Sequence, residues 1–157
     1  MKRSKRSYVE KHSFEYLIPH VRLGEFDLGG VLYHANYFHL LEETREAWLA
    51  SLGFPYPTLA NAGLHFAIVE SNQKFLKPIR YGQALKVMLQ TSAVRKSTLS
   101  VEYQIYLNLP KEEKQLVHTA RTVLAHIQSA NGTFRSKAIE PALLKRILEY
   151  SNEGSTS

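Results

Sequence analysis

The chain has 157 residues, which fits one domain, and its 44% hydrophobic and 22% charged residues are typical of a globular protein. It contains no cysteine, which excludes disulfides, thiolate metal sites and a cysteine nucleophile. No run of about 18 apolar residues is present, so we expect no membrane-spanning helix and no stable membrane insertion.

The formal net charge of +6 arises in part from residues 1–12, which carry five basic side chains against Glu10. We expect these residues to be a disordered terminus, because no basic face continues from them as a nucleic-acid-binding arm would require. No apolar segment follows them, so they are not a secretory signal. A chain without cysteine suits a reducing compartment, and we expect a cytoplasmic protein with no nucleic-acid partner.

The first predicted elements are a strand and a long helix. Apolar and polar side chains alternate over residues 14–18 and again over residues 21–23 after Pro19, which indicates an edge strand or a bulge. Apolar side chains at a spacing of three and four predict an amphipathic helix over residues 35–52, roughly 27 Å long. Gly53 and the prolines after it end this helix.

Four further strands and a short helix follow. The strands are predicted at residues 64–79, 83–95, 98–109 and 115–128. Asn131–Gly132 indicates a turn, and Pro141 opens a final helix. The side chains of that helix expected to face inward are Leu143, Leu144, Ile147 and Leu148. Residues 151–157 are expected to form a disordered tail.

These elements predict one α+β domain over residues 13–150. Connections of hairpin length imply antiparallel pairing of consecutive strands. A sheet with one apolar face must bury that face, and the long helix is the element available to cover it. We therefore expect an antiparallel sheet of about five strands wrapped around one long central helix.

The segment FDLGGVLYH places Asp27 in a glycine-rich connection just before the long helix. Glycines such as Gly30 let the backbone adopt positive φ and approach a ligand closely. The N–H groups at the start of a helix can stabilise an oxyanion that develops on a carbonyl. A carboxylate beside such groups suits acyl transfer, although Asp27 could also serve only to form the turn.

Other polar residues are weaker candidates. His34, at the start of the helix, could orient water, polarise a carbonyl or help to cap the helix, and its backbone N–H could matter more than its ring. Glu42 is expected to be buried or half-buried; it could pair with Arg45 or act as a general base. The histidines show no metal-ligand spacing, so no metal site is predicted.

Residues 26–53, FDLGGVLYHANYFHLLEETREAWLASLG, resemble the signature of the hotdog-fold acyl-CoA thioesterases of the 4-hydroxybenzoyl-CoA thioesterase family, in particular its Tol-Pal-associated branch. The segment FLKPIRYGQALKV is similar to a later strand pair of that family. The matching signature positions are Asp27, Gly29, Gly30, Val31, Tyr33, His34, Ala35, Asn36 and Tyr37, followed by Glu42 and Trp48.

The resemblance implies a hotdog fold over about residues 13–129 and hydrolysis of an acyl-CoA thioester. Asp27 matches the catalytic carboxylate, acting as nucleophile or general base, and the His34 N–H matches the oxyanion donor. It also implies a homodimer or homotetramer with active sites at subunit boundaries, and coenzyme A as part of the substrate, with no cofactor. The candidate substrate-binding residues are Gly30, Tyr33, Tyr37, Glu42 and Phe66, and the candidates for the CoA phosphates are Arg80, Arg95 and Lys96.

The chain departs from the family's pattern on either side of Asp27. Phe26 stands where the family often has threonine, and Leu28 where it often has alanine. We expect these bulkier residues to narrow the acyl pocket or to change the hydrogen bonds that hold Asp27. Two alternatives remain: the same reaction with Glu42 as the catalytic carboxylate, and a non-catalytic acyl-CoA-binding hotdog module.

Overall fold

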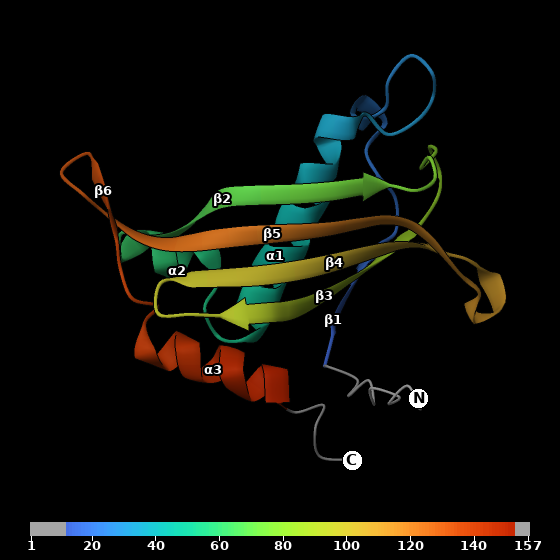
Figure 1. Ribbon diagram of the computed structural model, residues 1–157. Coiled ribbons are helices and arrows are strands. Elements are labelled where there is room, and N and C mark those ends of the chain that lie inside the picture. Colours follow the sequence, from blue (N-terminus) through green and yellow to red (C-terminus); the bar gives the residue numbers. More distant parts are fainter. Residues whose placement is uncertain (1–11, 153–157) are drawn as a thin grey trace, which may run out of the picture.

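The computed structural model describes residues 12–152, in which one antiparallel sheet curls around a single long helix, α1 (Tyr37–Ser51) (Figure 1). A 3-10 turn, η2 (His34–Asn36), leads into α1, so the helical segment covers the range predicted from the apolar spacing. The strands are β1 (Phe14–Ile18), β2 (Leu64–Phe75), β3 (Leu85–Val94), β4 (Thr98–Asn108), β5 (Lys114–Ala130) and β6 (Thr133–Ser136).

The strand order is β1-β3-β4-β5-β2, and β6 pairs with the end of β5. All neighbouring strands are antiparallel, which confirms the pairing predicted from short connections. β1 and β2 are therefore the two edges of the sheet. The predicted turn at Asn131–Gly132 is also confirmed: both residues have positive φ, 52° and 74°, as a tight two-residue hairpin requires.

The core lies between α1 and the concave face of the sheet. The apolar stripe of α1 faces the sheet, with Trp48 and Leu41 at its centre, because a sheet with one apolar face and one striped helix bury both surfaces together. Alternation of buried and less buried side chains along β3 and β4 supplies much of the opposite wall. The fully buried members of that wall include Leu85, Val87, Leu89, Leu99, Val101, Tyr103 and Ile105.

Several predicted boundaries change. The strand expected to resume at residues 21–23 does not form: Leu23 is exposed and begins a 3-10 turn, η1 (Leu23–Glu25). β2 ends at Phe75 rather than at residue 79, before Pro78, which could not donate a ladder hydrogen bond.

The helices also differ in detail from the predictions. A short helix, α2 (Tyr56–Asn61), was not predicted; proline at its start is compatible with a helix because the first N–H groups need no partner there. The final helix, α3 (Pro141–Asn152), buries Leu143 and Ile147 as expected, but Leu148 is exposed. Another short 3-10 turn, η3 (Pro110–Glu112), joins β4 to β5.

No helix in the described part of the chain is long and apolar enough to cross a membrane. α3 extends to Asn152, two residues past the predicted end of the domain. The predictions for residues 1–11 and 153–157 fall outside the described residues.

Two glycines after helices allow a matched test of this packing. Gly63 has a φ of 71°, and a Cβ added there would lie 2.8 Å from the Ser129 carbonyl oxygen; Gly53 has a φ of 90° and open space around it. We expect Gly53→Ala to lower the free energy of unfolding by about 1 kcal/mol, from the left-handed backbone alone. Gly63→Ala should cost about 2–3 kcal/mol, because the steric clash adds to that strain. Equal losses in urea unfolding would contradict this account.

Candidate active site

Asp27 lies in a tight hairpin between η1 and η2. The Phe26 and Leu32 backbones pair across the hairpin, and the Asp27 N–H donates to the Val31 carbonyl at 3.0 Å. The Asp27 side chain bonds within the same turn: Oδ1 accepts the Gly29 N–H at 2.7 Å and the Val31 N–H at 3.4 Å. Oδ2 takes no hydrogen bond within residues 12–152, so one carboxylate oxygen orients the group and the other is available.

The two glycines of the hairpin have different roles. Gly30 has a φ of 73°, which a residue with a Cβ adopts only under strain, so the turn requires glycine there. Gly29 has ordinary backbone geometry, but a Cβ at this position would lie 3.1 Å from Asp27 Oδ1. Gly29 therefore leaves room for the carboxylate, which folds back over the turn.

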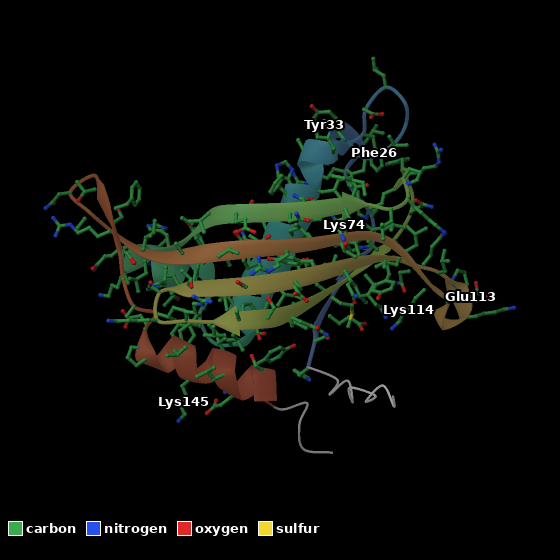
Figure 2. All side chains as sticks on the ribbon, viewed as in Figure 1. Phe26, Tyr33, Lys74, Glu113, Lys114 and Lys145 are labelled. Atoms are coloured by element: carbon green, nitrogen blue, oxygen red, sulfur yellow. The ribbon has the colours of Figure 1, made fainter. Side chains whose placement is uncertain are left out.

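The hairpin is joined to the start of α1 and to the β2–β3 connection. The Tyr33 N–H donates to the Glu25 carbonyl at 3.0 Å, and the Leu32 N–H donates to the Ile79 carbonyl at 2.8 Å. Figure 2 shows Phe26 and Tyr33 at the same end of the molecule, beside the N-terminus of α1. The hairpin and the start of α1 therefore meet the β2–β3 connection, a segment distant from them in sequence, at one end of the sheet.

A cavity of about 380 Å³ opens where these segments meet. The two predicted catalytic residues, Asp27 and His34, both line this cavity. The first N–H groups of a helical segment have no partner within it, and the His34 N–H finds no acceptor in the described part of the chain. The remaining lining residues are Val31, Leu32, Tyr37, Phe75, Leu76, Lys77 and Pro78.

The lining of the cavity includes two aromatic rings, the buried Tyr37 and the half-exposed Phe75. Tyr37 is 3% exposed, and its ring centroid lies 5.0 Å from that of Phe75 and 4.4 Å from that of His118 on β5. Burial raises the pKa of Tyr37, with a smaller opposing effect from the Ile79 backbone. Tyr37 therefore enters the cavity as a neutral ring, and its role in substrate binding stays a prediction.

His118 is a feature that the sequence did not reveal. Its Nε2 lies 3.0 Å from Gln73 Oε1, so the proton sits on Nε2, and its buried Nδ1 has no partner among the described residues. Burial lowers the pKa of His118 to about 4, so the ring is neutral at physiological pH. His118 packs under Tyr37 and Phe75 but is not among the residues that line the cavity.

The other predicted binding residues divide by position. Gly30 and Tyr33 are neighbours in sequence of residues that line the cavity. The exposed Tyr33 ring has its centroid 4.3 Å from that of the His34 ring. Arg80 is exposed in the segment that pairs with Val31, directly after the cavity-lining Pro78 and buried Ile79.

Phe66, Arg95 and Lys96 do not join the site within one chain. Phe66 lies near the start of β2 and packs its ring against His126, nine residues or roughly 30 Å along the strand from Phe75. Arg95 and Lys96 lie in the β3–β4 connection, at the end of the sheet opposite the Asp27 hairpin (Figure 1). The basic side chain that the structure places in the cavity is instead Lys77.

The prediction that Glu42 is buried or half-buried is wrong. Glu42 is exposed on α1, and it does not line the Asp27 cavity. Its expected partner Arg45 turns inward instead, is 8% exposed, and donates from Nη1 to Tyr103 Oη at 3.2 Å. The spacing of three residues along the helix suggested that the two side chains could pair. On α1, however, Arg45 faces the sheet and Glu42 faces outward.

The two bulky residues beside Asp27 do not narrow the cavity. Leu28 is fully exposed at the tip of the hairpin, and Phe26 packs edge-on against Tyr81 at 5.7 Å. Neither lines the cavity. The hydrogen bonds that hold Asp27 come from backbone N–H groups, which these side chains do not alter.

This architecture, an antiparallel sheet wrapped around one long central helix, is the hotdog fold. Residues 21–147 match the thioesterase-like superfamily, and the chain belongs to this family.

Relatives agree with this assignment. The chain is 28% identical over 112 residues to a putative esterase of Aquifex aeolicus, covering 71% of this chain and 82% of the relative. It is 37% identical over 67 residues to the putative acyl-CoA thioesterase YneP of Bacillus subtilis, covering 43% and 49% of the two chains. The fold matches that of a 4-hydroxybenzoyl CoA thioesterase variant complexed with 4-hydroxybenzoyl CoA, with a TM-score of 0.78, 16% identity, and coverage of 87% and 99%.

The buried, neutral His118 should make stability depend on pH. Its folded-state pKa of about 4 lies below the value of 6.5 expected in the unfolded chain, so the unfolded chain binds the proton more tightly. The contribution of His118 is fully present above pH 6.5 and is lost as the pH falls toward 4, a loss of about 3 kcal/mol.

Urea unfolding of wild type and His118→Gln at pH 7 and pH 4.5 tests this dependence. Glutamine keeps an amide to bond Gln73 but does not titrate, so the difference in stability between the two pH values should shrink in the variant. The same pH dependence in both proteins would show that His118 is not its source.

Proposed function

We propose that this protein is an acyl-CoA thioesterase, which hydrolyses an acyl-CoA thioester to a free carboxylic acid and coenzyme A. The observation that carries the proposal is that one cavity is lined both by Asp27 and by His34, the first residue of the helical segment. Similarity to proteins described as acyl-CoA thioesterases, and to a fold that holds 4-hydroxybenzoyl CoA, supports the same substrate class. We also propose membership of the 4-hydroxybenzoyl-CoA thioesterase family in its Tol-Pal-associated branch, and a cytoplasmic location.

In the proposed reaction the thioester carbonyl lies in the cavity with its oxygen toward the His34 N–H. This N–H is fixed by the backbone and points along the axis of the helical segment, so it can stabilise the negative charge of the tetrahedral intermediate without moving. The helix contributes in the same direction, since its N-terminus carries a partial positive charge.

Asp27 supplies the carboxylate. As a nucleophile, Oδ2 attacks the carbonyl carbon and expels the CoA thiolate, and water then hydrolyses the acyl-aspartate anhydride. As a general base, Asp27 takes a proton from water, the resulting hydroxide attacks the carbonyl, and the proton passes to the departing sulfur. Both routes end in a carboxylic acid and CoA, and both need the carboxylate held as the turn holds it.

The remaining cavity residues suit the rest of the substrate. Tyr37 and Phe75 offer apolar ring surface to an acyl group. Lys77 and Arg80 lie three residues apart and are both exposed, so their charges can meet the phosphates of coenzyme A. No metal or prosthetic group has a part in this scheme.

We further propose a homodimer, or a tetramer built from such dimers, that pairs two β2 edges. β2 is an open edge with Ile68 and Val69 exposed 46% and 61% beside a bulge. Antiparallel pairing of two identical edges would bring the Phe66 end of one strand beside the Phe75 end of the other. Phe66 of the partner subunit would then reach the site that Phe66 of the same chain cannot; the mass of one chain in light scattering would contradict this arrangement.

Asp27→Asn tests the catalytic carboxylate. Asparagine keeps Oδ1 to accept the Gly29 and Val31 N–H groups, so the hairpin should persist while the nucleophile or base is lost. We expect kcat for acyl-CoA hydrolysis, measured by thiol release over a panel of acyl chains, to fall by about 10²–10⁴-fold.

Glu42→Gln serves as the matched comparison and tests the alternative carboxylate. We expect this variant to keep wild-type turnover, because Glu42 is exposed and lies outside the cavity. Loss of activity in Glu42→Gln with retention in Asp27→Asn would reverse the assignment. Tight acyl-CoA binding by the wild type without CoA release would favour the non-catalytic binding module.

His34→Pro and His34→Ala separate the backbone donor from the imidazole ring. Proline removes the N–H but suits the first position of a helical turn, and Tyr33 before it already has the extended geometry (φ −63°, ψ 133°) that proline requires. We expect His34→Pro to lower kcat by about 10²–10³-fold, the usual cost of one oxyanion donor, and His34→Ala to lower it by less than about tenfold. Greater loss in His34→Ala would assign the role to the ring.

A further inference from the structure

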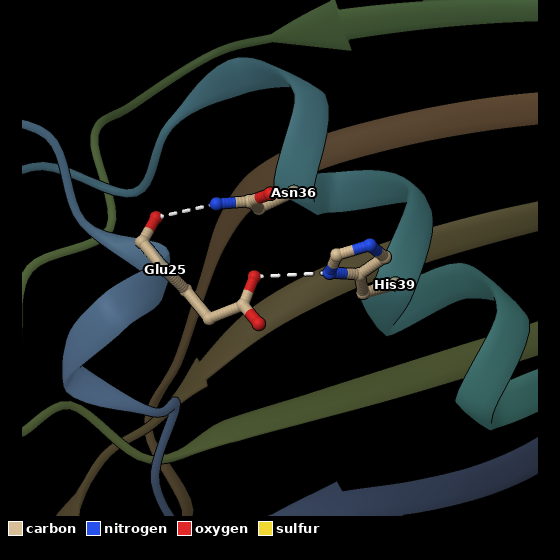
Figure 3. A network of polar contacts seen from close by, with 3 residues as sticks. All are labelled: Glu25, Asn36 and His39. Atoms are coloured by element: carbon tan, nitrogen blue, oxygen red, sulfur yellow. Dashed lines mark hydrogen bonds and ion pairs between the residues drawn. The ribbon is translucent and has the colours of Figure 1, made fainter.

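Asn36, the residue before α1, does not cap the helix. Asparagine at this position ordinarily accepts a hydrogen bond from an N–H of the first turn. Here η2 leads directly into α1, Asn36 has helical backbone angles (φ −79°, ψ −9°), and its side chain makes no capping bond. Its Nδ2 instead donates to the Glu25 carbonyl oxygen at 2.9 Å, eleven residues earlier in the chain (Figure 3).

Glu25 makes a second contact with the same helix. Its Oε2 lies 3.0 Å from His39 Nδ1, and Asn36 and His39 lie three residues apart on one face (Figure 3). The Tyr33 N–H also donates to the Glu25 carbonyl, which has two lone pairs and so accepts both bonds. We call the contacts of Glu25 with Tyr33, Asn36 and His39 the Glu25 clamp.

The Glu25 clamp joins the two halves of the candidate site. On one side Glu25 lies two residues before Asp27, with the paired residue Phe26 between them. On the other side Tyr33 and Asn36 flank His34, whose N–H is the oxyanion donor of the proposed reaction. Each contact of the clamp therefore fixes the segment that carries the carboxylate relative to the segment that carries the N–H.

Glu25, Asn36 and His39 lie outside the cavity in which the proposed substrate binds. None of them lines the Asp27 cavity, and Glu25 and His39 face a separate cavity of about 260 Å³. An effect of these side chains on the reaction must therefore act through the placement of Asp27 relative to the His34 N–H.

We propose that the Glu25 clamp positions Asp27 for the reaction, with Glu25, Asn36 and His39 as positioning residues. This inference rests on the proposed function, in which Asp27 is the catalytic carboxylate. A displacement of about 1 Å in a reacting group can cost about 10²-fold in rate, so a clamp that holds two segments in register has a large effect without touching the substrate.

The contacts of the clamp differ in strength. The Asn36 bond is partly buried, whereas the His39 side chain is 61% exposed and its pair with Glu25 is open to screening by solvent. Substitution of Asn36 should therefore cost more activity than substitution of His39.

Asn36→Asp is the sharpest variant. Aspartate has nearly the same shape and its charge is favourable at a helix N-terminus, but it cannot donate to the Glu25 carbonyl, so this contact of the clamp is lost. We expect kcat to fall by about 10–100-fold with KM within about threefold of wild type. His39→Ala should show a smaller fall in kcat, and His39→Asn, whose amide can still donate to Glu25, should restore most of it.

Glu43→Ala is the matched control. Glu43 is exposed on α1 and bonds Tyr16 Oη on β1 at 2.8 Å, so its loss removes one contact from α1 without touching the Asp27 hairpin. We expect wild-type kcat in this variant. An equal fall in kcat in Glu43→Ala and Asn36→Asp would overturn the clamp, because any weakening of α1 would then have the same effect.

The double variant Asp27→Asn with Asn36→Asp separates the clamp from the proposed function. If the clamp acts through Asp27, the double variant should be no slower than Asp27→Asn alone. A lower kcat in the double variant than in Asp27→Asn would overturn the positioning role of the clamp but not the role of Asp27. Wild-type kcat in Asn36→Asp, with Asp27→Asn inactive, would have the same meaning. Full activity in Asp27→Asn would instead overturn the assignment of Asp27.

Discussion

The burial of one face of α1 against the concave face of the sheet is the constraint on which the site depends. Trp48 and Leu41 lie at the centre of that contact and hold the helix at a fixed place across the strands. Its N-terminal end is then fixed beside the β2–β3 connection, where Leu32 bonds Ile79 and Tyr37 packs on Phe75. The Asp27 hairpin is attached to both, so the cavity is a consequence of the packing of α1.

The periodicity of side chains was sufficient to predict this framework. The spacing of apolar residues located the helix, and alternation located β3, β4 and β5, because burial of one face imposes these periods directly. Asp27, His34 and Tyr37 could be predicted together as site residues because they lie close together in sequence around one helix start, and the cavity that they line is built largely from that local segment.

Features that depend on tertiary contacts could not be predicted in this way. Phe66 and Phe75 lie on one strand, and only the orientation of β2 decides which end meets Asp27. The burial of Arg45 rather than Glu42 depends on the hydroxyl of Tyr103 across the core, fifty-eight residues away. The bond from Asn36 to Glu25 replaces a local cap that the sequence would favour, and β6 pairs with the part of β5 that extends beyond β4.

The oxyanion donor of the proposed reaction is a main-chain atom, and this has a consequence for divergence and redesign. Every residue except proline supplies a backbone N–H at position 34, so substitutions of this side chain leave the proposed oxyanion donor in place. The walls contributed by Phe75 and Leu76 come from a different segment, which can be re-engineered for another acyl group while the reactive machinery stays intact.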